Sequence, residues 1–280
     1  MTQTMTLKPV DILAQKPDYT KWLAEPPMVG DWARQFYREY VGLGDEEELK
    51  KHLMEVRDLA WKVYQYRCVA SFYFVNYNLA EGFGQEWYSG ILERVKQGDK
   101  FLDLACAFGH VARNLVYDGA PQENIISSDL RPEFWELGYQ LFRDRERFHG
   151  KFRQADIFDP TCLDDYNGKI NILHTSAFFH LFDLERQKRV VHVLLRLLST
   201  KRGTTIFGRQ AGNTVPEFRT HPWRPSDYGL YAHNAESFKS MFEEVAGDGW
   251  DVKTWLITKP DNVAPNGGTY GRLRFIITKL

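Results

Sequence analysis

Apolar residues recur at helical spacing through the first hundred positions of the chain. The pattern predicts three helices, over residues 31–41, 46–63 and 84–96, because apolar side chains three and four positions apart line one helix face. Asp45 is placed to cap the second of these helices, and Gly98 is placed to end the third. The densely aromatic stretch 64–77 between them is interpreted mainly as packing against helices, with closure of a pocket as the alternative.

After Gly98 the pattern changes to short apolar runs that alternate with amphipathic segments. The runs predict strands over residues 100–105, 124–129, 152–155, 169–175, 204–209, 250–259 and 270–278. The segments between them predict helices over residues 110–118, 132–143, 184–198 and 235–245. Strand-helix alternation is typical of a parallel sheet with helices on both faces. The last connection, KPDNVAPNGGT, carries proline and paired glycines, as a hairpin would.

These elements predict an α/β fold. It consists of a helical N-terminal cap over residues 1–97 and a Rossmann-like, mostly parallel sheet over residues 98–280 that ends in an antiparallel hairpin. Hydrophobic residues make up 43% and charged residues 26% of the 280 positions, which is typical of a globular protein. The aromatic content of 15% fits a large core or a pocket lined by rings, and the sequence leaves both interpretations open.

Charge and cysteine usage exclude several functional classes. The formal net charge of −1 and the absence of a basic stripe argue against nucleic-acid binding. The apolar stretches are too short for membrane insertion, and no secretory signal is visible. The three widely spaced cysteines are typical of reduced thiols, and the histidines show no paired metal-ligand spacing. We therefore expect a cytoplasmic protein without a metal.

The segment FLDLACAFG, residues 101–109, is the strongest local motif. Asp103 stands near the end of an apolar strand, and the small residues Ala105, Ala107 and Gly109 follow it. Small residues allow a close approach of the backbone to a ligand. The next helix begins near His110, so its free N–H groups face the same position.

Acidic residues also end the next two predicted strands. Asp129 is placed to accept both hydroxyls of a ribose. Asp156, beside apolar residues in QADIF, suits the amino group and the face of an adenine ring. Each acid could instead cap a helix. Three such acids in order, at consecutive strand ends, favour a nucleoside site.

Together these motifs resemble the class I S-adenosylmethionine-dependent methyltransferase family. The usual first motif of that family is Asp-x-Gly-x-Gly-x-Gly, and here alanines stand at positions 105 and 107. The resemblance covers residues 98–280, and it implies S-adenosyl-L-methionine as the cofactor. The cofactor contacts it implies are Asp103, Ala105, Ala107, Gly109, Asp129, Leu130, Asp156, Ile157 and Phe158.

The family positions its methyl acceptor after the fourth strand, where this chain reads HTSAFFHLF. The candidate catalytic residues are His180, Ser176 and Arg209. His180 could be a base or an orienting donor, Ser176 is similarly placed, and Arg209 could attract an anionic acceptor. Phe179 is a candidate substrate contact. The structural alternatives are a hydrogen-bonded histidine, a capping serine and a surface ion pair. Neither an Asn-Pro-Pro-Tyr motif nor an acidic metal ligand stands at this strand end.

Residues 218–231, FRTHPWRPSDYGLY, are expected to form a loop over the pocket. Long aromatic loops often carry function. The candidate substrate contacts in this loop are His221, Trp223 and Tyr228.

A narrower resemblance is carried by LDLACAFGHVARNL, SSDLRPEFWELGYQLF, QADIFD and HTSAFFHLFDLERQ. These segments are similar to those of fungal methyltransferases of meroterpenoid pathways, such as the pathways to austinol, andrastin and terretonin. The resemblance implies methyl esterification of the carboxyl group of a farnesylated aromatic acid, and it implies a homodimer.

Other functions stay open at this point. The acceptor atom could be a hydroxyl oxygen, a nitrogen or a carbon of another natural product. A binding protein that keeps the fold without catalysis is a further alternative, because two motif glycines are replaced. A nicotinamide dehydrogenase is disfavoured because the chain lacks Gly-x-Gly-x-x-Gly after its first predicted strand.

Overall fold

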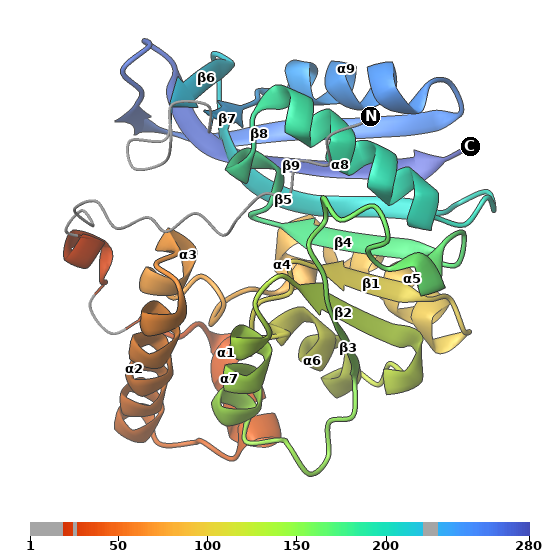
Figure 1. Ribbon diagram of the computed structural model, residues 1–280. Coiled ribbons are helices and arrows are strands. Elements are labelled where there is room, and N and C mark those ends of the chain that lie inside the picture. The colour runs from red at the N-terminus through yellow and green to blue at the C-terminus, as the bar shows by residue number, and fades with distance from the viewer. Residues whose placement is uncertain (1–18, 25–26, 221–228) are drawn as a thin grey trace, which may run out of the picture.

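The computed structural model describes residues 19–24, 27–220 and 229–280. Seven strands form one sheet in the order β3-β2-β1-β4-β5-β9-β8 (Figure 1). The strands are β1 (Phe101–Leu104), β2 (Ile125–Asp129), β3 (Lys151–Gln154), β4 (Ile172–Ser176), β5 (Thr205–Asn213), β8 (Trp250–Val263) and β9 (Thr269–Lys279). β1 to β5 are parallel, and β9 pairs antiparallel with both β5 and β8. The predicted parallel sheet with a C-terminal antiparallel hairpin is therefore confirmed.

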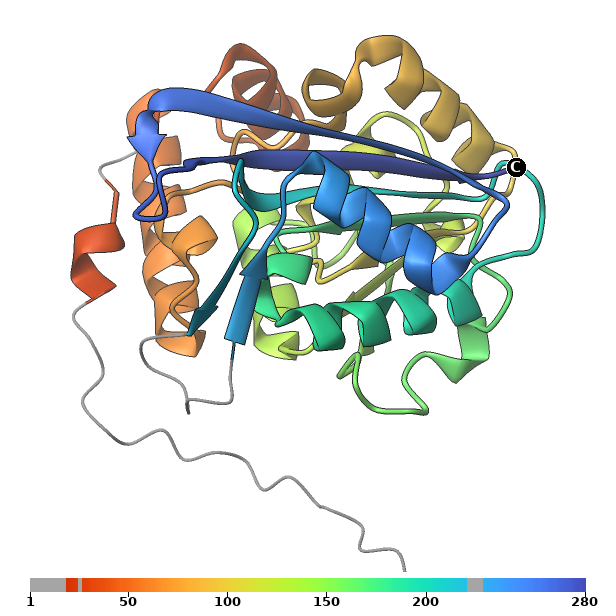
Figure 2. The ribbon, with the colours of Figure 1, turned by 90° about the horizontal axis from the view of Figure 1, so that it is seen from above.

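Helices cover both faces of this sheet (Figure 2). On one face lie α5 (Gln85–Lys96), α6 (His110–Tyr117) and α7 (Pro132–Phe142), and on the other lie α8 (Leu184–Leu197) and α9 (Ala235–Ala246). Side chains alternate along each strand, so Phe101 packs with the first group of helices and Leu102 with the second. The central strands β1, β2, β4 and β5 are therefore buried on both sides, as a doubly wound sheet requires, whereas the edge strands β3 and β8 are largely exposed.

The first N-terminal helices lie beside α7 rather than on the sheet (Figure 1). They are α1 (Asp31–Phe36), the π-helical η2 (Tyr37–Val41), α2 (Glu46–Val63) and α3 (Arg67–Ala70). The next helix, α4 (Leu79–Phe83), packs on the sheet, where the ring of Phe83 contacts that of Phe207 on β5. Asp45 caps α2 as predicted, because its side chain accepts a hydrogen bond from the N–H of Glu48 at 2.8 Å. Residues of α1 and α2 share one hydrophobic core with Phe134 and Phe142 of α7.

Short 3-10 segments complete the described chain: η1 (Tyr19–Trp22), η3 (Gln122–Asn124), η4 (Asp164–Tyr166) and η5 (Phe179–Leu181). The predicted loop over residues 218–231 is wrong at both ends. β6 (Glu217–Thr220) and β7 (Gly229–Ala232) pair there as an antiparallel two-stranded sheet. The reason is a close fit across the pair: a Cβ on Gly229 would lie 1.9 Å from the ring of Phe218, so glycine leaves room for that ring.

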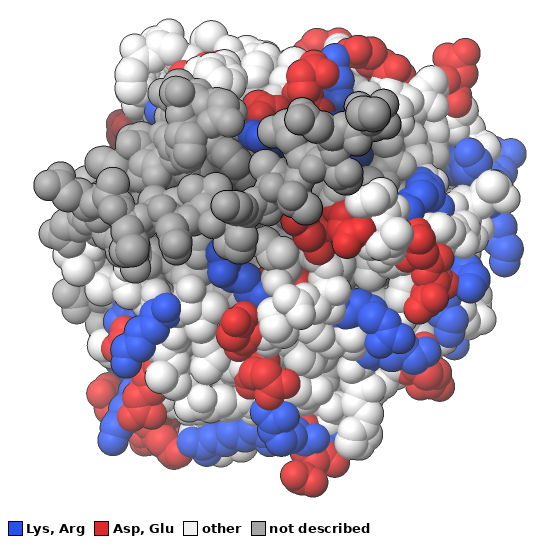
Figure 3. Space-filling view, in the orientation of Figure 1, with Lys and Arg blue, Asp and Glu red and all other residues white. Residues whose placement is uncertain are grey.

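Among the helices that the structure describes, none combines the length and the apolar character needed to cross a bilayer. On the face shown in Figure 3, Lys and Arg side chains lie interspersed with Asp and Glu. This mixture agrees with the near-neutral net charge of −1.

Candidate active site at the carboxyl edge of the sheet

The loop between β1 and α6 has the sharp backbone turn that its small residues predict. Ala105, Ala107 and Gly109 all lie in the left-handed region, with φ of 59°, 47° and 65°. Gly109 is also confined by packing, since a Cβ there would lie 2.4 Å from the ring of Trp135. The two alanines therefore adopt a turn that the usual motif achieves with glycines, and α6 still begins at His110.

Asp129 ends β2, and its carboxylate holds this loop. Oδ2 accepts a hydrogen bond from the N–H of Ala107 at 2.9 Å, and Oδ1 accepts one from the N–H of Arg131 at 2.9 Å. Burial raises the pKa of Asp129, although both hydrogen bonds act against the increase. The guanidinium of Arg131 stacks on Tyr64 at 4.1 Å, and Leu130 is half exposed. Part of the aromatic stretch thus lies against this strand end.

The turn that carries Asp156 starts next to Asp129. The N–H of Ala155 donates to the Asp129 carbonyl at 3.1 Å, and Asp156 Oδ1 accepts from the N–H of Phe158 at 2.9 Å. Ile157 is buried in the core between the sheet and α8. The structure therefore brings the turn carrying Asp156 beside Asp129, whereas the Ile157 side chain points into the core.

Asp103 belongs to a buried polar network that we call the Tyr77 network: Asp103, His174, Tyr77 and Ser176. Asp103 and His174 are direct neighbours in the β1–β4 register, and Oδ1 accepts from Nδ1 at 2.7 Å. Nε2 of His174 lies 2.8 Å from the Tyr77 hydroxyl and 2.9 Å from Ser176 Oγ. The two hydroxyls are 2.8 Å apart, so three polar atoms form a triangle. Asp103 Oδ2 is buried without a partner among the described residues.

The network is strongly coupled electrostatically. Burial acts to lower the pKa of His174, but Tyr77 and Asp103 raise it to about 9. Burial opposes ionisation of the Tyr77 hydroxyl, yet His174 and Arg209 bring its pKa below the usual value of 10. His174 therefore carries a proton near neutral pH.

Arginines adjoin this network on β5 and β9. Arg209 is in register with Ser176 and lies directly opposite Arg274, and its guanidinium stacks on the Tyr77 ring at 3.7 Å. Burial lowers the pKa of Arg209 to about 10, and Arg272 and Arg274 add to the effect. Within the described part of the chain, no carboxylate lies within ion-pair distance of Arg209, Arg272 or Arg274. A cationic, partly buried site without an internal anion is suited to bind one.

The other predicted acceptor contacts lie elsewhere. His180 is on η5, where burial lowers its pKa to about 4, and its Nδ1 has no hydrogen-bond partner in the described residues. Phe179 is 2% exposed and packs in the core against Phe238 and Phe275. Three predicted contacts fall outside the described residues: His221, Trp223 and Tyr228. The structure thus joins Ser176 to Arg209 through Tyr77, and within the described chain neither of them forms a hydrogen bond with the His180 side chain.

Sequence reasoning missed Tyr77 and His174. Tyr77 was interpreted as one more aromatic packing residue, and nothing local distinguishes it from its neighbours. His174 carried a usable signal, because a histidine inside an otherwise apolar strand needs a polar partner when buried. The adjacent strand β1 supplies that partner at Asp103.

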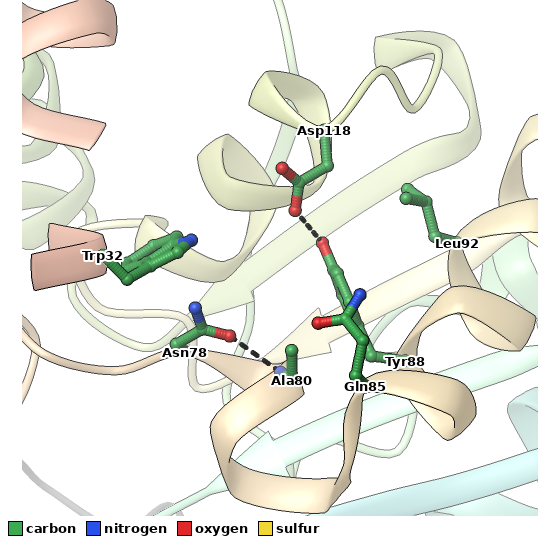
Figure 4. Close-up of a pocket in the computed structure, with 7 residues that line it drawn as sticks. All are labelled: Trp32, Asn78, Ala80, Gln85, Tyr88, Leu92 and Asp118. Atoms are coloured by element: carbon green, nitrogen blue, oxygen red, sulfur yellow. Dashed lines mark hydrogen bonds between the residues drawn. The ribbon is translucent and has the colours of Figure 1, made fainter. Parts of the chain in front are cut away.

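A cavity of about 290 Å³ lies away from this edge, between α1, α4, α5 and α6 (Figure 4). Its lining includes Tyr88, whose hydroxyl donates to Asp118. Asp118 follows the last residue of α6, at the end opposite to His110. The described residues that line the cavity therefore include none of the predicted site residues.

The amino-acid sequence matches those of known proteins. Residues 19–75 match the meroterpenoid methyltransferase N-terminal domain. The chain is 39% identical to methyltransferase adrK of Penicillium roqueforti over 236 residues, covering 84% of this chain and 81% of that protein. It is 36% identical to O-methyltransferase phiE of Fungal sp. (strain ATCC 74256), covering 74% and 69%.

The fold also matches a solved structure. A putative sarcosine dimethylglycine methyltransferase from Galdieria sulphuraria superposes with a TM-score of 0.51 at 13% identity, covering 89% of this chain and 98% of that one. At that identity the likeness concerns the fold alone. The two fungal relatives, each more than 30% identical and covered over more than two thirds of their length, and the matched N-terminal domain show that this protein is a methyltransferase and that the chain belongs to the fungal meroterpenoid methyltransferase family.

Proposed function

We propose that the methyl donor is S-adenosyl-L-methionine, bound at the carboxyl ends of β1, β2 and β3. Two observations fit this group. Asp129 keeps lone pairs free beside its two backbone hydrogen bonds, and it suits a ribose diol. The buried, unpartnered Oδ2 of Asp103 suits an ammonium group. The backbone at Ala105, Ala107 and Gly109 would approach the cofactor closely. Leu130, Asp156 and Phe158 would lie against its adenine base.

The donor supplies an electrophilic methyl group on a sulfonium, so the protein has little covalent chemistry to perform. The remaining tasks are to align the nucleophile and to exclude water. Tyr64 and Arg131 cover the β2 end, and Tyr77 covers the β4 and β5 ends. The N-terminal helical part therefore contributes to the wall of the proposed site.

For the acceptor we propose the carboxyl group of a small aromatic or prenylated acid, which is methylated to its ester. The observation that carries this proposal is Arg209, a partly buried cation beside Ser176 that has no carboxylate partner in the described chain. A carboxylic acid is already ionised at neutral pH and needs positioning rather than a base. The relative phiE is named an O-methyltransferase, which supports an oxygen acceptor.

The test is product analysis with 3-farnesyl-4-hydroxybenzoic acid, which offers a carboxyl group and a phenol in one molecule. Mass spectrometry and NMR of the product should show the methyl ester. Arg209→Met should raise KM for the acid about 10- to 100-fold, because a charge-assisted hydrogen bond is lost. Arg145→Met, at an exposed ion pair with Glu136, is the matched control. A methyl ether as the sole product would contradict the carboxyl assignment and favour a hydroxyl acceptor.

Three expectations from the sequence stay predictions: the division of the chain after residue 97, the homodimer and the cytoplasmic location. Light scattering of the purified protein measures the oligomeric state directly.

A further inference from the structure

The number of polar hydrogens in the Tyr77 network limits the directions in which the Ser176 hydroxyl can donate a hydrogen bond. Asp103 accepts the Nδ1 proton of His174, which leaves Nε2 to face the two hydroxyls. Tyr77 and His174 are each 2% exposed, whereas Ser176 is partly exposed at the end of β4. Ser176 is therefore the member of the triangle that can meet a ligand.

The protonation state of His174 decides the direction of these hydrogen bonds. When Nε2 carries a proton, it donates to one hydroxyl oxygen of the triangle. With Tyr77 as that acceptor, the Tyr77 O–H donates to Ser176 Oγ, and the Ser176 O–H is left to donate outward. When Nε2 is bare, it needs a donor, and both hydroxyls compete to supply it. A protonated His174 thus makes Ser176 an outward donor beside Arg209.

We propose that Asp103, His174 and Tyr77 are positioning residues that make the Ser176 hydroxyl donate a hydrogen bond to the acceptor carboxylate held by Arg209. This inference rests on the proposed carboxyl acceptor. It assigns recognition to two groups: Arg209 provides the charge, and Ser176 provides a directional donor. The register supports the pairing, since Ser176 and Arg209 are neighbours on β4 and β5.

The groups that face His174 make this arrangement dependent on pH. They are Asp103 on β1, Tyr77 before α4, His110 on α6 and Arg209 on β5. Burial lowers the pKa of His110 to about 3, so His110 is neutral at the pH values that matter here. His174, with a pKa of about 9, and Tyr77, whose pKa is lowered from its usual value of 10, both lose protons in the alkaline range, and the loss of either proton breaks the chain of donors from His174 through Tyr77 to Ser176. We then expect KM for the acid to rise above pH 9 while kcat changes much less.

The kinetic test uses 3-farnesyl-4-methoxybenzoic acid, because a phenol would titrate in the same range. Tyr77→Phe keeps the ring under Arg209 and removes the hydroxyl. Tyr77→Phe and Ser176→Ala should each raise KM about 10- to 100-fold. The KM of the double variant should not exceed the higher of the two single-variant values. Tyr117→Phe, whose hydroxyl donates to Glu39 on the surface, is the control and should match the unaltered enzyme.

A second measurement does not depend on turnover. Nitrogen-15 NMR of labelled histidines should show one imidazole that titrates near pH 9 in the unaltered protein and at a lower pH in Tyr77→Phe. Three results would each contradict the proposed role of the Tyr77 network. They are an unchanged KM in Tyr77→Phe, multiplicative effects on KM in the double variant, and the absence of an imidazole that titrates near pH 9. An enzyme that forms ethers but no esters would instead overturn the proposed function, while the NMR titration would still report on the network.

Discussion

Asp129 shows how one side chain can couple a loop to a ligand. Its two carboxylate oxygens fix the N–H groups of Ala107 and Arg131, and their remaining lone pairs are proposed to bind a ribose. In Asp129→Asn one oxygen becomes an NH2 group, which cannot accept and would face a backbone N–H. We expect affinity for S-adenosylhomocysteine to fall about 10- to 100-fold, as measured by isothermal titration calorimetry.

The control for this prediction is Asp251→Asn, which removes a carboxylate from an exposed ion pair with Lys253 on β8. Its affinity for S-adenosylhomocysteine should equal that of the unaltered protein. If Asp129→Asn bound S-adenosylhomocysteine as tightly as the unaltered protein, Asp129 would not be part of the donor site. A lower melting temperature of ligand-free Asp129→Asn would show that its role in the loop is lost as well.

At the scale of elements, Arg113 connects α6 to the loop before it and to α7. Its side chain is fully buried, with Asp144 at 2.6 and 3.1 Å and the Phe108 carbonyl at 2.8 Å. Aromatic rings surround the guanidinium, with that of Phe148 4.3 Å away. Arg113→Met leaves the buried Asp144 carboxylate with Tyr40 as its remaining side-chain partner among the described residues. We expect the free energy of unfolding to fall by about 3–5 kcal/mol, measured by urea denaturation.

The double variant Arg113→Met/Asp144→Leu provides the matched comparison. Removing both charges eliminates the uncompensated carboxylate, so the double variant should be more stable than Arg113→Met. If it is less stable, the ion pair is not the cause, and the contacts of Arg113 with carbonyls and rings dominate instead.

The strands, the helices and the order of the acidic strand ends could be predicted because they depend on local periodicity. Apolar alternation and capping residues are short-range signals, and they located α2 to the residue. The contact of Tyr77 with Ser176, 99 positions apart, depends on how the N-terminal segment crosses the sheet. The pairing of β6 with β7 depends likewise on Phe218 meeting Gly229 across the strands. No local pattern encodes these contacts.

At the scale of the whole molecule, buried histidines should shape the dependence of stability on pH. Burial lowers the pKa of His110 to about 3 and those of His180 and His233 to about 4, from 6.5 in the unfolded chain. Below pH 6.5 the unfolded chain therefore binds more protons, and the free energy of unfolding falls as the pH falls. His174, raised to about 9, acts oppositely: its stabilisation is complete below pH 6.5 and is lost as the pH rises through 9.

We therefore expect the melting temperature to be highest near pH 6.5 and to decline towards both pH 5 and pH 9, as measured by calorimetry at constant ionic strength. Each histidine whose pKa is lowered adds up to about 1.4 kcal/mol per pH unit to the decrease of the free energy of unfolding below pH 6.5. His180→Gln should make the decline of the melting temperature between pH 6.5 and 5 less steep, because it removes one of the three groups that take up a proton on unfolding. His192→Gln changes an exposed histidine of α8 and should leave the profile as it is. A profile that is level from pH 5 to 6.5 would mean that these three histidines are hydrated in solution, and water would then reach His110 where its ring contacts that of Tyr77.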